Sequence, residues 1–261
     1  MQPTEEQERI VASDAGSLVV EAGAGAAKTT TLGLYASARP RSRILYLAFN
    51  KSIQLEAAAR MPPNVNCRTT HSIAWRKAAE LFGGEASQRV GKTYASSVAR
   101  TFRCGPLVAT AALQAIQNWC GSLSSQIDAS HVPTDIAERL ADPGSVVEIA
   151  RATWARMCRP DGGELRLPHD GYLKLFQMEE PTLRGQDLVA VDEAQDLNMC
   201  TYDIVRRQCG GLVLVGDSAQ QIFAFRGSAN ALRIHEADHR LQLTRSFRFG
   251  ESLAQMANAL L

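Results

Sequence analysis

Residues 21–30 read EAGAGAAKTT and give the strongest indication of the fold of this chain. It follows a short apolar run at residues 17–20 that predicts a buried strand. A strand, then a glycine-containing loop, then a lysine and a threonine that open a helix form a phosphate-binding pattern. Backbone N–H groups at the helix N-terminus attract phosphate, the lysine neutralises phosphate oxygens, and the hydroxyl ligates magnesium. Lys28 and Thr29 stand where this chemistry requires them.

The loop departs from the usual G-x-x-x-x-G-K-[ST] pattern at both glycine positions, which are Ala22 and Ala27. The methyl group of Ala27 lies where the backbone approaches phosphate. If this residue needs a positive φ, alanine costs about 1 kcal/mol or more relative to glycine, and at a negative φ it costs almost nothing. An ordinary βα turn that happens to contain AKT is the competing interpretation of the loop taken alone.

Adjacent acids follow a second apolar run, in the stretch VAVDEAQD at residues 189–196. In P-loop nucleotide hydrolases an aspartate at the end of a neighbouring strand holds magnesium, directly or through water. The next glutamate can orient and deprotonate the attacking water. Asp192 and Glu193 therefore favour a nucleotide-hydrolysing site, whereas acids that merely leave a strand for solvent are the alternative.

The order of helical and strand signals predicts an interrupted sheet. At the start of the chain, strand signals alternate with helical ones and predict a parallel sheet, with strands near residues 18–21, 43–49 and 66–69. The following part has apolar residues at helical spacing and no convincing strand. Strand signals return at residues 187–191, 212–215 and 241–243. We predict an α/β fold in which a helical insertion, residues 85–183, separates two parts of one sheet domain, 1–84 and 184–261.

Composition narrows the class of protein. The net charge of +1 neither supports nor excludes a nucleic-acid partner, because a neutral protein can gather basic residues in one groove. The six cysteines form no CxxC pair, which argues against a zinc site and a disulfide framework. The N-terminus is polar and acidic, unlike a secretory signal, and no apolar run approaches the ~20 residues that span a bilayer. We expect a cytoplasmic protein with no membrane partner.

The two sites belong to a longer series of motifs. DEAQD and the stretch VGDSAQQIFAFRG, residues 215–227, resemble motifs II and III of the superfamily 1A DNA helicases, the UvrD/Rep/PcrA group. Further similarities are LTRSFR at 243–248 to the start of motif IV, FNK at 49–51 to motif Ia, THS at 70–72 to motif Ib, and Gln7 to the adenine-reading Q motif.

Within this group, the sequence most resembles the F-box DNA helicase branch and its bacterial and phage relatives. The stretches FNKSI, HDGYLKL and SFRFG carry this resemblance. The matches run in the family's order across nearly the whole chain. Ala22 is what the UvrD-like group commonly carries, so only Ala27 departs from the family's loop. The resemblance implies a RecA-like P-loop NTPase sheet, called domain 1A, with an inserted helical subdomain, called 1B, and ATP and Mg²⁺ as cofactors.

Roles in nucleotide binding are implied motif by motif. Gln7 would hydrogen-bond adenine, and Thr29 and Asp192 would bind magnesium. The residues of the loop would contact ATP, namely Ala22, Gly23, Ala24, Gly25, Ala26, Ala27, Lys28, Thr29 and Thr30.

Three catalytic roles follow from the same resemblance. Glu193 would be the general base, and Gln220 would sense the γ-phosphate and couple it to the DNA track. Arg248 would be the arginine finger that stabilises transition-state charge, an effect worth ~10³-fold or more in related NTPases. A surface arginine at the start of a helix is the competing interpretation of Arg248.

The predicted contacts with DNA come from aromatic rings and from polar groups near the DNA phosphates. Single strands are held without sequence preference by stacking on aromatics, worth ~1–3 kcal/mol per base. By resemblance Phe225 would be such a platform, with Phe49 and His71 near the track and Asn50 or Lys51 near the backbone. A phenylalanine in an apolar stretch is commonly core, and His71 can equally be a hydrogen-bonded structural histidine.

The HDGYLK segment leaves two interpretations open. Tyr172 and Lys174 can touch DNA, or the segment can anchor the insertion to the sheet.

Two functions from different classes follow. The first is an ATP-dependent DNA helicase or translocase, 3′-to-5′ by resemblance, of which this chain is the N-terminal motor half. It would bind single-stranded DNA and work with a second RecA-like domain, since motifs V and VI have no counterpart before residue 261. The second is a short non-motor ATP- or DNA-binding module that needs a partner chain. The joint presence of a base, a γ-phosphate glutamine and a finger favours the first.

Overall fold

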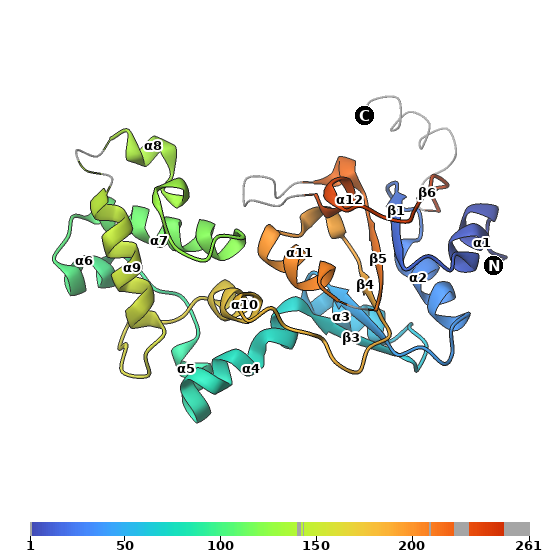
Figure 1. Cartoon of the computed structure of the whole chain (residues 1–261), viewed down its shortest axis with the longest axis horizontal. Coiled ribbons are helices and arrows are strands. Elements are labelled where there is room, and N and C mark those ends of the chain that lie inside the picture. Colours follow the sequence, from blue (N-terminus) through green and yellow to red (C-terminus); the bar gives the residue numbers. More distant parts are fainter. Residues whose placement is uncertain (1, 140–141, 143, 209, 222–229, 248–261) are drawn as a thin grey trace. The chain divides into compact units, whose positions relative to one another are not determined.

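The computed structural model describes residues 2–139, 142, 144–208, 210–221 and 230–247. The chain divides into two compact units. A sheet unit comprises Met1–Thr70, Thr182–Asn198 and Ile204–Leu261, and a helical unit comprises His71–Pro181 with Met199–Asp203. Figure 1 shows the elements of both units coloured along the chain.

The sheet unit is built on a six-stranded sheet whose strand order is β3-β2-β4-β5-β1-β6. Every neighbouring pair is parallel. The strands are β1 (Ser17–Ala22), β2 (Ile44–Ala48), β3 (Val65–Thr69), β4 (Leu188–Val191), β5 (Gly211–Gly216) and β6 (His239–Leu243). The predicted α/β parallel sheet is confirmed, and the carboxyl ends of all these strands share one edge.

Helices cover both faces of the sheet, and its central strands are buried as a result. All residues of β2 and β4 are buried, which is typical of parallel sheets covered by helices. The longer helices of this unit are α1 (Glu5–Ala12), α2 (Lys28–Ser37) and α3 (Lys51–Ala58). The short ones are η3 (Ala194–Asp196), η4 (Ser218–Gln220) and α12 (Ala231–Ile234).

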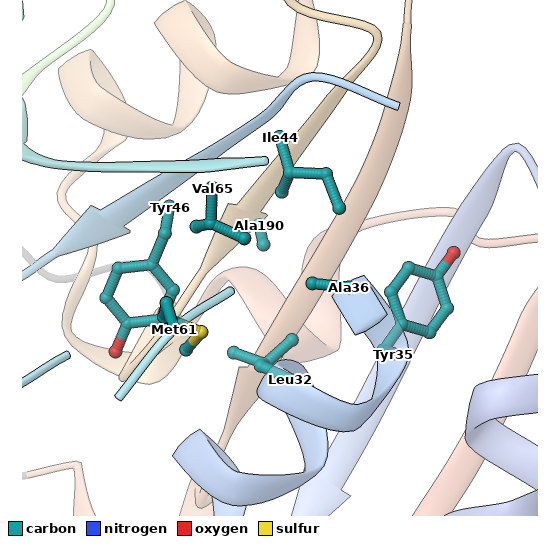
Figure 2. A pocket seen from close by; sticks show the side chains of 8 residues that line it. All are labelled: Leu32, Tyr35, Ala36, Ile44, Tyr46, Met61, Val65 and Ala190. Carbon is teal, nitrogen blue, oxygen red and sulfur yellow. The ribbon is translucent and has the colours of Figure 1, made fainter. Parts of the chain in front are cut away.

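The interior between α2 and the sheet contains a small apolar hollow of about 10 Å³. Figure 2 shows its lining, which includes Leu32 and Tyr35 of α2, Tyr46 of β2 and Ala190 of β4. This volume holds at most one water molecule, so the hollow is a packing defect and not a nucleotide site.

The helical unit contains most of the remaining helices. They are α4 (Thr70–Phe82), η1 (Gly83–Glu85), α5 (Ala86–Arg89), α6 (Ala95–Phe102), α7 (Pro106–Gly121), η2 (Ala129–His131), α8 (Thr134–Ala137), α9 (Gly144–Met157) and α10 (His169–Met178). Helix α11 (Met199–Arg206) begins in this unit and ends in the sheet unit. Apart from one isolated bridge between Val90 and Leu167, the described residues of 71–181 form no strand.

The core of the helical unit is aromatic and aliphatic. Trp119 of α7 meets Trp154 of α9 edge to face, with ring centroids 4.8 Å apart.

Within the described residues no helix is long and apolar enough to cross a membrane. The described cysteines are all free thiols, namely Cys67, Cys104, Cys120, Cys158 and Cys200.

The HDGYLK segment forms the first turns of α10 and points inward. Tyr172 is 2% exposed and Lys174 is fully buried. The Lys174 ammonium donates to the Ser122 carbonyl at 2.8 Å and to Gln177 Oε1 at 3.0 Å. Gln177 in turn donates to the buried Asp203 carboxylate at 2.6 Å. The burial of Lys174 argues against its contact with DNA. The hydrogen bonds described here lie within the helical unit, so the anchoring of the insertion to the sheet stays a prediction.

Replacing Lys174 with alanine removes the donor to the Ser122 carbonyl and the Gln177 amide oxygen and opens a cavity beside Trp119. We expect the free energy of unfolding of the helical unit to fall by about 2–4 kcal/mol. All three tryptophans lie in this unit, so urea denaturation followed by tryptophan fluorescence reports it selectively. Lys92→Ala, at an exposed site, is the control and should change stability by less than about 0.5 kcal/mol. Equal midpoints for the two variants would contradict this account of Lys174.

Candidate functional site

The loop between β1 and α2 turns sharply before the helix begins at Lys28. Gly25 has φ +72° and Ala27 has φ +57° with ψ +41°. Ala27 is the residue before the first turn of α2 and accepts a hydrogen bond from Thr31 N at 3.0 Å. The question that the sequence left open is therefore answered: Ala27 has the left-handed conformation that favours glycine.

Two charged side chains face each other at the carboxyl edge of the sheet. The Lys28 ammonium lies 3.4 Å from Glu193 Oε2, and both side chains are largely shielded, with 13% and 29% exposed. Glu193 follows β4 and also has a positive φ, +53°. Strained backbone of this kind persists only where surrounding contacts hold it and is concentrated at functional sites.

Asp192 is buried, with 4% of the residue exposed. Its Oδ2 accepts hydrogen bonds from the Tyr46 hydroxyl at 2.6 Å and from the Thr29 hydroxyl at 3.1 Å. Burial raises the pKa of Asp192 above its usual value, and the Glu193 charge adds to this, while the Tyr46 hydrogen bond and the Lys28 ammonium oppose it. A carboxylate desolvated in this way gains from a nearby cation.

The arrangement fits magnesium bound together with a nucleotide. Magnesium keeps several waters and is held by one or two carboxylates plus substrate phosphates, without a dedicated protein cage. The structure offers one buried carboxylate, Asp192, with the Thr29 hydroxyl beside it. No cluster of three or more histidine, cysteine or acidic side chains that could hold a metal by itself exists among the described residues.

A hydrogen-bonded chain connects Glu193 to the turn after β5. Gln195 donates to Glu193 Oε2 at 2.9 Å and accepts from Asp217 N at 3.0 Å. The side chain of Asp217 accepts from Gln220 Nε2 at 2.5 Å, and Gln220 itself is exposed. A Cβ on Gly216 would come within 2.2 Å of Gln195 Oε1, so glycine is required for this approach.

Sequence reasoning missed three residues of the site, namely Gln195, Tyr46 and Asp217. Gln195 lies in DEAQD between the acids Glu193 and Asp196, and this position was the available signal. Tyr46 was indistinguishable from a core aromatic in its apolar strand. Asp217 lies in the stretch that resembles motif III, residues 215–227, but only the fold brings its backbone N–H to Gln195.

Gln7 is almost buried, at 4% exposure. Its Oε1 accepts from Thr4 N at 3.0 Å, which completes a capping box at the start of α1, and its Nε2 donates to Thr31 of α2 at 3.0 Å. Gln7 therefore ties the N-terminal helix to the helix that carries Lys28. Its contact with adenine stays a prediction.

The predicted DNA-contacting residues are distributed over both units. Phe49 follows β2 and is 41% exposed, while Asn50 caps α3 by accepting from Ile53 N at 2.9 Å. Lys51 donates to Gln54 at 2.7 Å. In the helical unit, His71 Nε2 lies 3.0 Å from Asp170 Oδ1. Their contacts with DNA stay predictions.

Two predicted site residues, Phe225 and Arg248, lie outside the described residues. Among the others, the structure brings Lys28, Thr29, Asp192 and Glu193 together at one edge. It does not bring Gln220 to them directly, because Gln195 and Asp217 lie between.

Comparisons with known proteins show which family this chain belongs to. A family model described as an AAA domain matches residues 7–226. F-box DNA helicase 1 of Gallus gallus is 35% identical over 281 residues, which cover 99% of this chain and 27% of that protein. F-box DNA helicase protein 1 of Schizosaccharomyces pombe is 31% identical over 269 residues, covering 94% and 30%. ATP-dependent DNA helicase UvrD1 of Mycobacterium leprae is 25% identical over 310 residues, covering 98% and 39%.

The chain belongs to the AAA domain family, and its similarity is to the motor region of superfamily 1 UvrD-like helicases, as the motifs predicted. It spans between 27% and 39% of the length of these relatives.

Replacing Ala27 with glycine removes a left-handed strain of roughly 1–2 kcal/mol and adds unfolded-state entropy of about 0.4–1 kcal/mol. We expect the free energy of opening of β1 and α2 to rise by about 0.5–1 kcal/mol, as measured by native-state hydrogen exchange. ATP binding should be preserved or tightened.

Ala24→Gly is the matched control, because Ala24 lies in the same loop and is absent from the positive-φ residues. Its glycine variant should be no more stable than the parent. A loss of stability or of ATP affinity in Ala27→Gly would show that the methyl group makes a necessary contact.

Proposed function

We propose that this chain is the first motor domain of an ATP-driven DNA helicase or translocase, which moves 3′-to-5′ and binds ATP-Mg²⁺ and single-stranded DNA. The observation that carries the proposal is the convergence of Lys28, Thr29, Asp192 and Glu193 at the carboxyl edge of a parallel sheet. A lysine, a hydroxyl, a buried carboxylate and a second acid are the groups that phosphoryl transfer to water requires.

Each group has a distinct task in this proposal. The N-terminus of α2 and Lys28 hold the phosphates, and Thr29 and Asp192 hold magnesium, which neutralises charge that develops on the phosphate oxygens. Lys28 is paired with Glu193 in the structure. Phosphate oxygens that draw the ammonium away leave Glu193 free to accept a proton from water.

The remaining assignments rest on motif position. Gln220 would respond to the γ-phosphate, and the Gln195–Asp217 link supports this because it joins the Gln220 turn to Glu193. We propose that the helical unit is the inserted subdomain expected at residues 85–183, although the unit also takes in α4. A second RecA-like domain would complete the site. A pure binding module has no use for a general base, so the Lys28–Glu193 pair favours the motor.

Lys28→Ala and Glu193→Gln each should lower ATP hydrolysis by about 10²-fold or more, because the first removes phosphate binding and the second removes the base. The measurement is phosphate release with and without single-stranded DNA, on the product of the full open reading frame that encodes the chain. Glu80→Gln, an exposed acid of the helical unit, is the control and should hydrolyse like the parent. Hydrolysis that survives both site substitutions unchanged would reject the proposed function.

Phe49→Ala should weaken binding of single-stranded DNA by about 1–3 kcal/mol, the contribution of one base stacked on one ring. Fluorescence anisotropy with labelled oligonucleotides measures this, with an ATP titration alongside that should not change. Leu55→Ala, which removes another exposed apolar side chain from the same unit, is the control. Equal DNA affinities for the Phe49 and Leu55 variants would remove Phe49 from the DNA track and leave Phe225 as the predicted platform.

A further inference from the structure

Glu21 places a carboxylate one residue before the phosphate-binding loop. It lies near the carboxyl end of β1, in parallel register with Gly216 of β5. Negative charge at this position opposes the binding of a nucleotide, since like charges repel strongly where solvent is partly excluded. None of the roles proposed above uses this residue, so its contacts need a separate explanation.

Both oxygens of the Glu21 carboxylate bind a single residue, Ser218. Oε1 accepts from Ser218 N at 2.6 Å, and Oε2 accepts from Ser218 Oγ at 3.0 Å. The same hydroxyl lies 3.4 Å from Asn230 Oδ1, but it has one proton and the carboxylate is nearer. Charge-assisted bonds to backbone and side chain together fix the position of Ser218.

Ser218 is the first residue of η4, the turn that carries Gln220. Within this turn, Asp217 accepts from Ala219 N at 3.0 Å and from Gln220 Nε2 at 2.5 Å. These local bonds set the shape of the turn but do not attach it to the nucleotide loop. Glu21 attaches it to β1, the strand that leads directly into that loop.

We infer that Glu21 is a positioning residue, which fixes the Ser218–Gln220 turn against the strand of the nucleotide loop and thereby holds Gln220 for its task at the γ-phosphate. The inference rests on the proposed function. Both carboxylate oxygens of Glu21 accept hydrogen bonds from Ser218. The negative charge of Glu21 therefore faces the Ser218–Gln220 turn and is partly compensated by these donors.

The test compares Glu21→Ala with Glu21→Gln in the product of the full open reading frame. The amide of glutamine can still accept from Ser218 N and donate to the hydroxyl, whereas alanine removes both bonds. Two quantities are measured, the Kd of a fluorescent ATP analogue and kcat for hydrolysis with single-stranded DNA.

In Glu21→Ala, kcat should fall about tenfold while the Kd stays within about twofold, because a contact to the turn is lost and a repulsive charge is also removed. Glu21→Gln should keep kcat within about threefold of the parent, since its hydrogen bonds can be rebuilt. An unchanged kcat in Glu21→Ala would overturn the inference. A Kd that weakens as much as kcat falls would overturn it too, since Glu21 would then merely support the loop.

Lys28→Ala and Glu193→Gln separate this result from the proposed function. If both abolish hydrolysis and Glu21→Ala does not alter kcat, only the inference about Glu21 fails. If the parent does not hydrolyse ATP, the proposed function fails, and hydrogen exchange then tests the inference. Binding of the ATP analogue should change exchange at residues 217–220 in the parent and in Glu21→Gln but not in Glu21→Ala. The same change in all three proteins would overturn the inference.

Discussion

The buried carboxylate of Asp192 is the constraint on which the candidate site depends. It stands at the end of β4, the strand between β2 and β5, and accepts hydrogen bonds from Tyr46 of β2 and Thr29 of α2. One side chain therefore ties β4 to β2 and α2, two elements that lie about 150 residues earlier in the sequence. Burial raises the pKa of Asp192, so the ionised form is held at a cost that the Tyr46 hydrogen bond and the Lys28 charge only partly offset. A divalent cation with a nucleotide would relieve that cost, so in the proposed function the same group would be both a structural link and a magnesium ligand.

The site accumulates local features that an isolated segment would avoid. Ala27, before α2, and Glu193, after β4, both have positive φ. Glu193 lies beside Lys28, and Glu21 is matched by the two donors of Ser218. Proteins that violate local rules do so chiefly at functional sites, where the surrounding fold holds the strain. The position of these exceptions agrees with the proposed function.

Much of the fold could be predicted because its signals are local. The apolar runs at 17–20 and 189–191 appear as strands, and the helical spacing predicted at 145–158 appears as α9, Gly144–Met157. The parallel sheet follows from the alternation of strand and helix signals. The φ of Ala27 could not be predicted, since an alanine in a loop does not fix its own backbone. The hydrogen bonds of Tyr46 and Lys174 could not be predicted either, because their partners lie 146 and 52 residues away in the sequence. Only the folded chain brings these groups together.

The most direct test of the account is whether magnesium strengthens ATP binding through Asp192. Equilibrium titration of the chain with a fluorescent ATP analogue, in magnesium and in chelator, measures the ratio of the two affinities. We expect the parent to bind the analogue more tightly in magnesium than in chelator. Asp192→Asn keeps the size of the side chain but loses its charge, so its two affinities should be equal. Equal affinities in magnesium and in chelator for the parent would contradict the assignment of this edge of the sheet as an ATP-Mg²⁺ site.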